Sequence, residues 1–247
     1  MKPSRKYTSA TAFRVAWEDR LKRLAQEEKI DLQRVRRQAA FDRLLCRLFA
    51  KPDALWLLKG GYAMELRLKT ARTTRDIDLA LRQLPMPTRD WDANASTVLE
   101  ALREVGLLDL GDFFTFVLGD AVQDLEAAPY GGARFPVEAR LAGRSFVKFH
   151  LDVSTGDVLR EPYESLAGRD WLGFAGVASA TFRAVSPEDC RKRFVRHFNA
   201  GRRTKFRLHS LRHPLPGSSP SQRWQSNADL HRIWRGNLKW SLNSSAV

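Results

Sequence analysis

Apolar residues recur at steps of three and four between residues 10 and 50, with charged residues between them. This period predicts amphipathic helices. The pattern is interrupted near Lys29 to Asp31, so two helices are expected there. A second stretch with the same period covers Ser96 to Val105 and predicts a further helix.

Short apolar runs and alternating segments predict strands between and after these helices. ALWLLKGG is an apolar run ending in two glycines, as a buried strand entering a tight turn does. TTRDIDLAL predicts a second strand that pairs with it, and FFTFVLG, ARFPVEARLAG and RSFVKFHLDVSTG predict three more. The helix-strand-helix-strand order predicts an α/β or α+β domain with a mixed sheet flanked by helices.

The alternation along RSFVKFHLDVSTG assigns its side chains to two faces of the sheet. One face is expected to carry Phe146, His150 and Asp152. The other, buried face is expected to carry Val147, Phe149, Leu151 and Val153.

Length and composition fit a globular protein. The chain has 247 residues, of which 43% are hydrophobic and 28% charged, and this excludes wholesale disorder and collagen-like or coiled-coil designs. No run approaches the roughly 18 apolar residues of a membrane span, and MKPSRKYTSATAFR has no apolar signal-peptide core. We expect a soluble cytoplasmic protein with no membrane partner. Cys46 and Cys190 are too few and too isolated for a disulfide scaffold or a zinc cluster.

The net charge of +14 is concentrated at the C-terminal end. Residues 190–247 contain thirteen Lys or Arg and one acid, a net charge of +12, so residues 1–189 carry only +2. Their LRHPLPGSSPSQRWQSN segment interrupts any regular period. We therefore expect one domain over 1–189 and a basic, poorly packed region over 190–247.

Three carboxylates form the candidate catalytic and metal-binding set. Asp76 and Asp78 are two apart in a strand and point to the same side. Two carboxylates this close raise each other's pKa unless a cation lies between them, and their oxygens suit Mg²⁺. Asp152, from a neighbouring strand, is the expected third acid of a two-metal site that activates a hydroxyl nucleophile.

A glycine turn beside these acids predicts a phosphate site. The Gly60-Gly61 turn allows a phosphate to approach the backbone, and the next helix offers free N–H groups. The expected reaction is attack on the α-phosphate of an NTP with pyrophosphate as the leaving group. Asp-x-Asp alone is more often a solvated strand face, and Gly-Gly alone is usually a turn, but the whole arrangement is much rarer. The candidate nucleotide-binding residues are Lys59, Gly60, Gly61, Arg67, Arg72, Thr74 and Arg75.

Three segments closely resemble the AbiEii-type nucleotidyltransferase toxins: LLKGGYAMELRLKTARTTRDIDLAL, GARFPVEARLAGRSFVKFHLDVSTGD and DWLGFAGVASATFRAVSPE. The resemblance covers roughly residues 10–189 and implies the minimal nucleotidyltransferase fold of the polymerase β superfamily. It also implies Mg²⁺-dependent nucleotide transfer from an NTP, with tRNA 3′ ends as acceptors. The expected context is a bacterial toxin-antitoxin, phage-defence (abortive infection) pair restrained by a neighbouring antitoxin.

The chain departs from the family pattern in two places. Tyr62 follows the glycines where the wider superfamily often has Ser, so phosphate contact there would rest on backbone N–H groups. After the AVSPE segment, family members have a helix with an Ala-Glu-Lys core and then a Lys-Asp-Leu segment. This chain reads DCRKRFVRHFNAGRRTKFRLHS instead, with Lys192 as a possible stand-in for the catalytic lysine.

The basic region therefore has two explanations. It is either an RNA-binding extension, with Trp224, Trp234 and Trp240 as stacking surfaces, or an out-of-frame translation that begins near Cys190. The alternatives to an active enzyme are accordingly a catalytically impaired family remnant and a basic RNA-binding module.

Overall fold

The computed structural model describes residues 7–68, 73–82, 91–124, 131–157, 159–186 and 188. These residues belong to the first of the two units into which the chain divides, Met1–Cys190. The basic region 190–247, with Lys192 and its tryptophans, lies outside the described residues, so its poor packing stays a prediction.

The described part contains four α-helices, one 3₁₀ turn and eight strands. The helices are α1 (Ala10–Glu27), α2 (Leu32–Leu48), α3 (Gly60–Arg67) and α4 (Trp91–Gly106), and η1 is Gly173–Ala175. The strands are β1 (Trp56–Lys59), β2 (Asp76–Leu81), β3 (Phe114–Leu118), β4 (Gln123–Asp124), β5 (Gly132–Leu141), β6 (Arg144–Ser154), β7 (Glu164–Ala167) and β8 (Thr181–Ala184). The strands predicted from the sequence are confirmed; β4, β7 and β8 are additional. None of the described helices is both long and apolar enough to cross a membrane.

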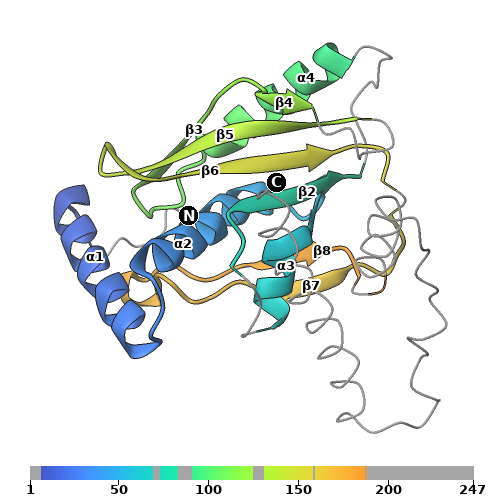
Figure 1. Ribbon diagram of the computed structural model, residues 1–247. Coiled ribbons are helices and arrows are strands. Elements are labelled where there is room, and N and C mark those ends of the chain that lie inside the picture. The colour runs from blue at the N-terminus through green and yellow to red at the C-terminus, as the bar shows by residue number, and fades with distance from the viewer. Residues whose placement is uncertain are drawn as a thin grey trace, which may run out of the picture. The chain divides into compact units, whose positions relative to one another are not determined.

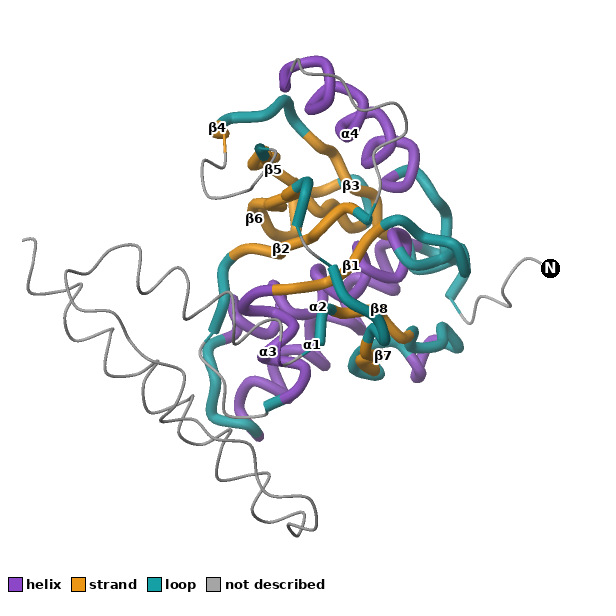
Figure 2. The backbone as a smooth tube through the Cα atoms, turned by 90° about the vertical axis from the view of Figure 1, so that its right-hand side faces the viewer, coloured by secondary structure: helices purple, strands orange, loops and turns teal. Residues whose placement is uncertain are grey.

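All eight strands join one mixed sheet, as predicted (Figure 1). Its order is β3-β5-β6-β2-β1-β8-β7, and β4 pairs with β5. β2 runs antiparallel to β1 but parallel to β6, and β1 runs parallel to β8. Figure 2 shows β5, β6, β2, β1 and β8 in succession across the sheet. β2 thus lies between the glycine-ended strand β1 and the strand that carries Asp152.

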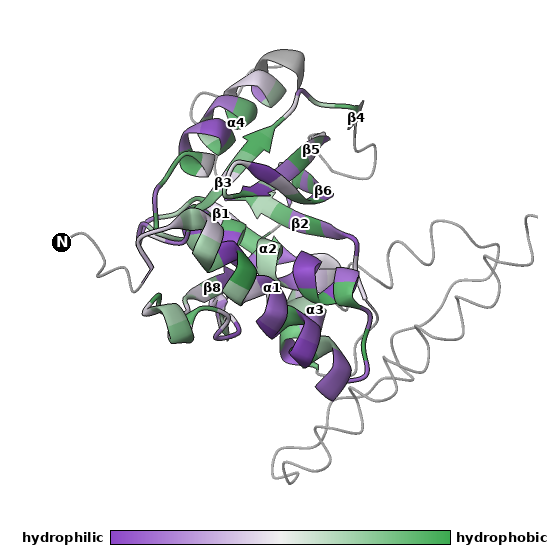
Figure 3. Cartoon of the chain, turned by 90° about the vertical axis from the view of Figure 1, so that its left-hand side faces the viewer, coloured by the Kyte–Doolittle hydropathy of each residue, from purple (hydrophilic) through white to green (hydrophobic). Residues whose placement is uncertain are grey.

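The first two helices are separated by local capping signals. Asp31 begins α2, with its side chain accepting a hydrogen bond from Arg34 N, as a good N-cap does. Lys29, between the helices, has a positive φ of 54°, which no helix continues through. In Figure 3, hydrophilic and hydrophobic stretches alternate along α1 and α4, as expected of helices with one buried face.

The main core lies between the helices and one face of the sheet. Phe135, Leu151 and Ile77 are fully buried on neighbouring strands of this face. The ring of Phe41 on α2 packs edge-on against Phe149 on β6, with 4.8 Å between the ring centroids. The predicted burial of the odd-numbered residues of β6 is therefore confirmed for its central part.

The prediction for Phe146 is wrong. The pairing of β5 with β6 shifts between Ala139 and Arg140, because Ala139 lies opposite Val147 whereas Arg140 lies opposite Ser145. This bulge adds one residue to β6 and reverses the alternation. Phe146 consequently turns to the core face, where its ring packs edge-on against Phe114 at 5.4 Å.

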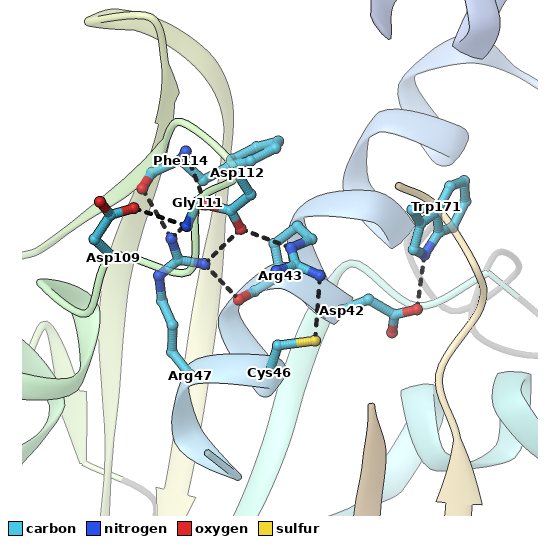
Figure 4. Close-up of polar contacts among 9 residues, drawn as sticks. All are labelled: Asp42, Arg43, Cys46, Arg47, Asp109, Gly111, Asp112, Phe114 and Trp171. Carbon is cyan, nitrogen blue, oxygen red and sulfur yellow. Dashed lines mark hydrogen bonds and ion pairs between the residues drawn. The ribbon is translucent and has the colours of Figure 1, made fainter. Parts of the chain in front are cut away.

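A buried ionic cluster joins α2 to the segment before β3 (Figure 4). Asp112 is fully buried and accepts hydrogen bonds from Arg43 Nε at 2.7 Å and from Arg47 at 2.7 and 3.0 Å. Arg47 also donates to Phe114 O at 2.9 Å. Burial alone would raise the pKa of Asp112, but the two guanidinium groups hold it below its usual value. The cluster fixes α2 against the sheet.

Candidate functional site

Four charged residues form a row across four adjacent strands. Lys59 on β1 lies opposite Asp78 on β2, and Asp78 lies opposite Asp152 on β6. Asp152 in turn lies opposite Arg134 on β5. Residues paired across neighbouring strands share a face of the sheet, so the sequence-predicted acids 78 and 152 are neighbours on one face, away from the main core.

Asp76 lies one pair further along the same face. It is opposite His150 on β6, and the two side chains approach to 3.4 Å between His150 Nδ1 and Asp76 Oδ1. The fold therefore gathers Asp76, Asp78 and Asp152 on adjacent positions of two parallel strands. His150, exposed over 45% of its side chain, flanks this acid cluster.

The turn between β1 and α3 lies directly against the carboxylate of Asp78. Gly60 has a positive φ of 63°, and a Cβ added there would lie 2.0 Å from Asp78 Oδ2. Gly61 N donates to the same oxygen at 3.3 Å. Only glycine fits at position 60, because a side chain would occupy the space of the carboxylate. The backbone of the turn and Asp78 therefore form one compact cradle at the start of α3.

Asp78 is the most perturbed acid of the cluster. Burial, together with the neighbouring charges of Asp152 and Asp76, raises its pKa to about 6, against the opposing effects of Lys59 and the Gly61 N–H. Like charges held this close favour protonation unless a cation compensates them. The cluster thus has the electrostatics of a cation-binding site.

Asp152 already has a cationic partner, which was not predicted from the sequence. Arg134 Nε donates to Asp152 Oδ1 and Arg134 Nη2 to Asp152 Oδ2, both at 2.7 Å. Arg134 Nη2 also lies 3.7 Å from Asp76 Oδ2. The hydrogen bonds to Asp152 raise the pKa of Arg134 above its already high value. The sequence signal for this residue is its place on the polar side of the alternating strand ARFPVEARL.

The donor set suits Mg²⁺ in part. Asp76 and Asp78 supply hard carboxylate oxygens beside a glycine cradle, which is the ligand chemistry that Mg²⁺ prefers. Both carboxylate oxygens of Asp152 already accept hydrogen bonds from Arg134. Within the described ranges, no three acidic, histidine or cysteine side chains are arranged to hold a metal ion. Asp152 fits as a third ligand only when the guanidinium moves away.

Lys59, a candidate phosphate-binding residue, lies directly opposite Asp78 in the sheet. Its Nζ donates to Ser154 Oγ at 2.5 Å and to Asp157 Oδ2 at 3.0 Å, at the end of β6. Its charge also opposes the rise in the pKa of Asp78. Its ammonium is already paired with Asp157, so the predicted contact of Lys59 with a triphosphate stays a prediction.

Of the other candidates, Thr74 and Arg75 lie next to Asp76, whereas Arg67 binds a different part of the fold. Arg67 donates to Glu164 Oε2 at 2.8 Å and to Val185 O at 2.6 Å, so its guanidinium joins α3 to β7. Thr74 donates its N–H to Glu65 and its hydroxyl to Asp76 O, which fixes the approach to β2. Arg75 is exposed beside Asp76. Arg72 lies outside the described residues.

Tyr62, which stands where the superfamily often has Ser, points away from the acids. Its side chain is 2% exposed, and its hydroxyl donates to Asp42 Oδ1 at 2.6 Å. Asp42 also accepts hydrogen bonds from Trp171 Nε1 at 2.7 Å, drawn in Figure 4, and from Arg169 N at 2.9 Å. The residue after the glycine pair therefore anchors α3 to α2 through a buried carboxylate.

This anchor predicts a pH-dependent stability. Burial raises the pKa of Asp42 to about 6 from an ordinary value of 3.8, against the hydrogen bonds from Tyr62, Arg169 and Trp171. The folded state thus holds this proton more tightly than the unfolded state. The resulting stabilisation is fully present below about pH 4 and is lost as the pH rises through about 6. Two pKa units correspond to about 3 kcal/mol.

In Asp42→Asn, a neutral isostere, this fall in the free energy of unfolding is expected to disappear. The measurement is urea unfolding of both proteins at intervals between pH 4 and 7. Asp78 is present in both proteins, so its own titration cancels in the difference. Parallel curves for wild type and Asp42→Asn would contradict the prediction.

Comparisons with known proteins agree with the resemblance seen in the sequence. Residues 43–191 match the family described as the nucleotidyl transferase AbiEii toxin of type IV toxin-antitoxin systems. No curated protein sequence matches the chain.

Among solved structures, the nucleotidyltransferase toxin MenT4 from Mycobacterium tuberculosis H37Rv is similar, with a TM-score of 0.51 and 19% identity. The alignment covers 74% of this chain and 59% of MenT4. JHP933 from Helicobacter pylori aligns with a TM-score of 0.43 and 15% identity, over 73% of this chain and 64% of that one. The similarity to MenT4 confirms the predicted nucleotidyltransferase-like fold. The family match spans more than half of the sequence, and the chain therefore belongs to the AbiEii family of nucleotidyltransferase toxins of type IV toxin-antitoxin systems.

Proposed function

We propose that this chain transfers a nucleotide from an NTP to the 3′ end of a tRNA, with Mg²⁺ held by Asp76, Asp78 and Asp152. The observation that carries the proposal is the convergence of these three carboxylates from two parallel strands beside the glycine turn. Family membership supplies the reaction class. In this context the chain acts as the toxin of a phage-defence pair, restrained by a cognate antitoxin.

The residues around the acids have separable roles. The Gly60-Gly61 turn lets the triphosphate approach the backbone, and Lys59 offsets its charge. The 3′ hydroxyl oxygen attacks the α-phosphorus and loses its proton to the acid cluster, the bond to the β-phosphate oxygen breaks, and pyrophosphate leaves. Bound Mg²⁺ would neutralise the phosphate oxygens and lower the pKa of the attacking hydroxyl.

The test is incubation of the purified chain with each labelled NTP, Mg²⁺ and total tRNA. Label is expected in the tRNA band with wild type, and its transfer is expected to fall about a hundred- to a thousandfold in Asp78→Asn and Asp76→Asn. Asp109→Asn, in the loop before β3, is the matched control and should transfer label like wild type. No transfer by well-folded wild-type protein would contradict the proposal.

A second candidate is a catalytically impaired family member, favoured by the missing Ala-Glu-Lys and Lys-Asp-Leu motifs after AVSPE. Such a protein would bind NTP without turnover. Equilibrium dialysis with labelled NTP separates the two, because retained binding without transfer identifies the impaired form. An encoding DNA whose other frame restores both motifs beyond residue 190 would identify the same form.

A further inference from the structure

Arg134 lies inside the acid cluster and is held there by a bidentate contact. Its two donors reach the two oxygens of Asp152 at 2.7 Å each, and one of them lies 3.7 Å from Asp76 Oδ2. The strand pairing places Arg134 directly opposite Asp152. Such fork-shaped pairs between arginine and a carboxylate are the strongest and most directional ion pairs in proteins.

The contact occupies the oxygens that a cation would need. A guanidinium and a divalent cation placed on the same carboxylate would repel each other over a few ångströms. The Asp152 side chain is 11% exposed, whereas the Arg134 side chain is 29% exposed. The arginine is therefore the more solvent-accessible partner and the one expected to move.

We propose that Arg134 is the resident counter-ion of the acid cluster and competes with the divalent cation for Asp152. The inference rests on the proposed function, because it takes the three acids as the cation ligands. Cation binding then requires the guanidinium to leave, so Arg134 is a positioning residue that lowers the affinity of the free protein for Mg²⁺. The same residue stabilises the protein without a cation, since three neighbouring carboxylates otherwise repel one another.

The test uses Mn²⁺ as the probe, with binding to the full-length protein followed by electron paramagnetic resonance of the free ion. Arg134→Gln removes the charge and is expected to tighten Mn²⁺ binding at least about tenfold. In EDTA, the same variant is expected to melt at a lower temperature than wild type. Saturating Mn²⁺ should raise the melting temperature of the variant by more than it raises that of wild type.

Arg140→Gln is the matched control. Arg140 is exposed on the same strand, β5, and pairs with the half-buried Glu138 at 2.7 Å. Its loss should leave the Mn²⁺ dissociation constant unchanged. Should Arg134→Gln fail to fold, Arg134→Lys keeps the charge but cannot form the fork, and its Mn²⁺ affinity should still exceed that of wild type.

Two results would overturn the proposal, and they differ in what they leave standing. Mn²⁺ binding that is equal or weaker in the Arg134 variants, with wild-type binding abolished by Asp78→Asn, would remove the role of Arg134 and leave the proposed function intact. Absence of Mn²⁺ binding in wild type and in every variant would overturn both.

Discussion

Asp112→Asn is expected to lower the free energy of unfolding by about 3–5 kcal/mol. The substitution leaves Arg43 and Arg47, both almost fully buried, without a compensating negative charge. An uncompensated charge in the protein interior is among the most costly changes a single residue can make. The folded-state pKa of Asp112 is lowered, so its contribution is present at neutral pH and is lost as the pH falls through that pKa.

The measurement is guanidinium chloride unfolding at pH 7, followed by circular dichroism. Asp120→Asn is the control, because Asp120 also pairs with an arginine, Arg103, but its side chain is 89% exposed. A surface pair of this kind contributes about 0–1 kcal/mol. Equal midpoints for the two variants would show that the buried cluster does not hold α2 against the sheet.

Gly60→Ala is expected to reduce nucleotide transfer at least about a hundredfold, since an ångström-scale displacement of a reacting group has that effect. The new Cβ would lie 2.0 Å from Asp78 Oδ2, so the carboxylate has to move out of the cradle. The positive φ of 63° adds strain, and the expected loss of stability is about 1–3 kcal/mol.

Gly143→Ala separates the two effects. Gly143 lies in the turn between β5 and β6 with a φ of 72°, and an added Cβ would meet nothing within 4 Å. This variant should lose stability through backbone strain but keep full transfer activity. If Gly60→Ala transfers label as well as Gly143→Ala does, the close approach of the glycine to Asp78 has no part in the reaction.

Most of the regular structure could be predicted because its determinants are local. Asp31 caps α2, and the apolar period of residues 10–50 marks both helices. Strict alternation marks β5, in which Phe135 and Val137 are buried while Arg140 is exposed. Strands β7 and β8 escaped prediction because they have only four residues each, too few to establish a period, and lack the continuous apolar run that marks the equally short β1.

The burial of Phe146 could not be predicted from the alternation of apolar and polar residues along β6. The alternation is correct for Phe149 to Val153, but the extra residue of β6 opposite the Ala139–Arg140 step reverses it beyond that point. A bulge depends on how two strands pair, and the pattern of one strand does not contain that information.

The sequence by itself determined the helices, five strands, the glycine turn and the three acids of the candidate site. Residue order and spacing suffice for these, because capping, periodicity and turn preference act over a few neighbouring residues. Only the tertiary structure decided that Asp78 and Asp152 lie side by side and that Arg134 donates two hydrogen bonds to Asp152. It also decided that the Tyr62 hydroxyl binds the buried Asp42. These contacts join residues 18 to 74 positions apart, and strand register and burial, which no local pattern encodes, select the partner of each charge.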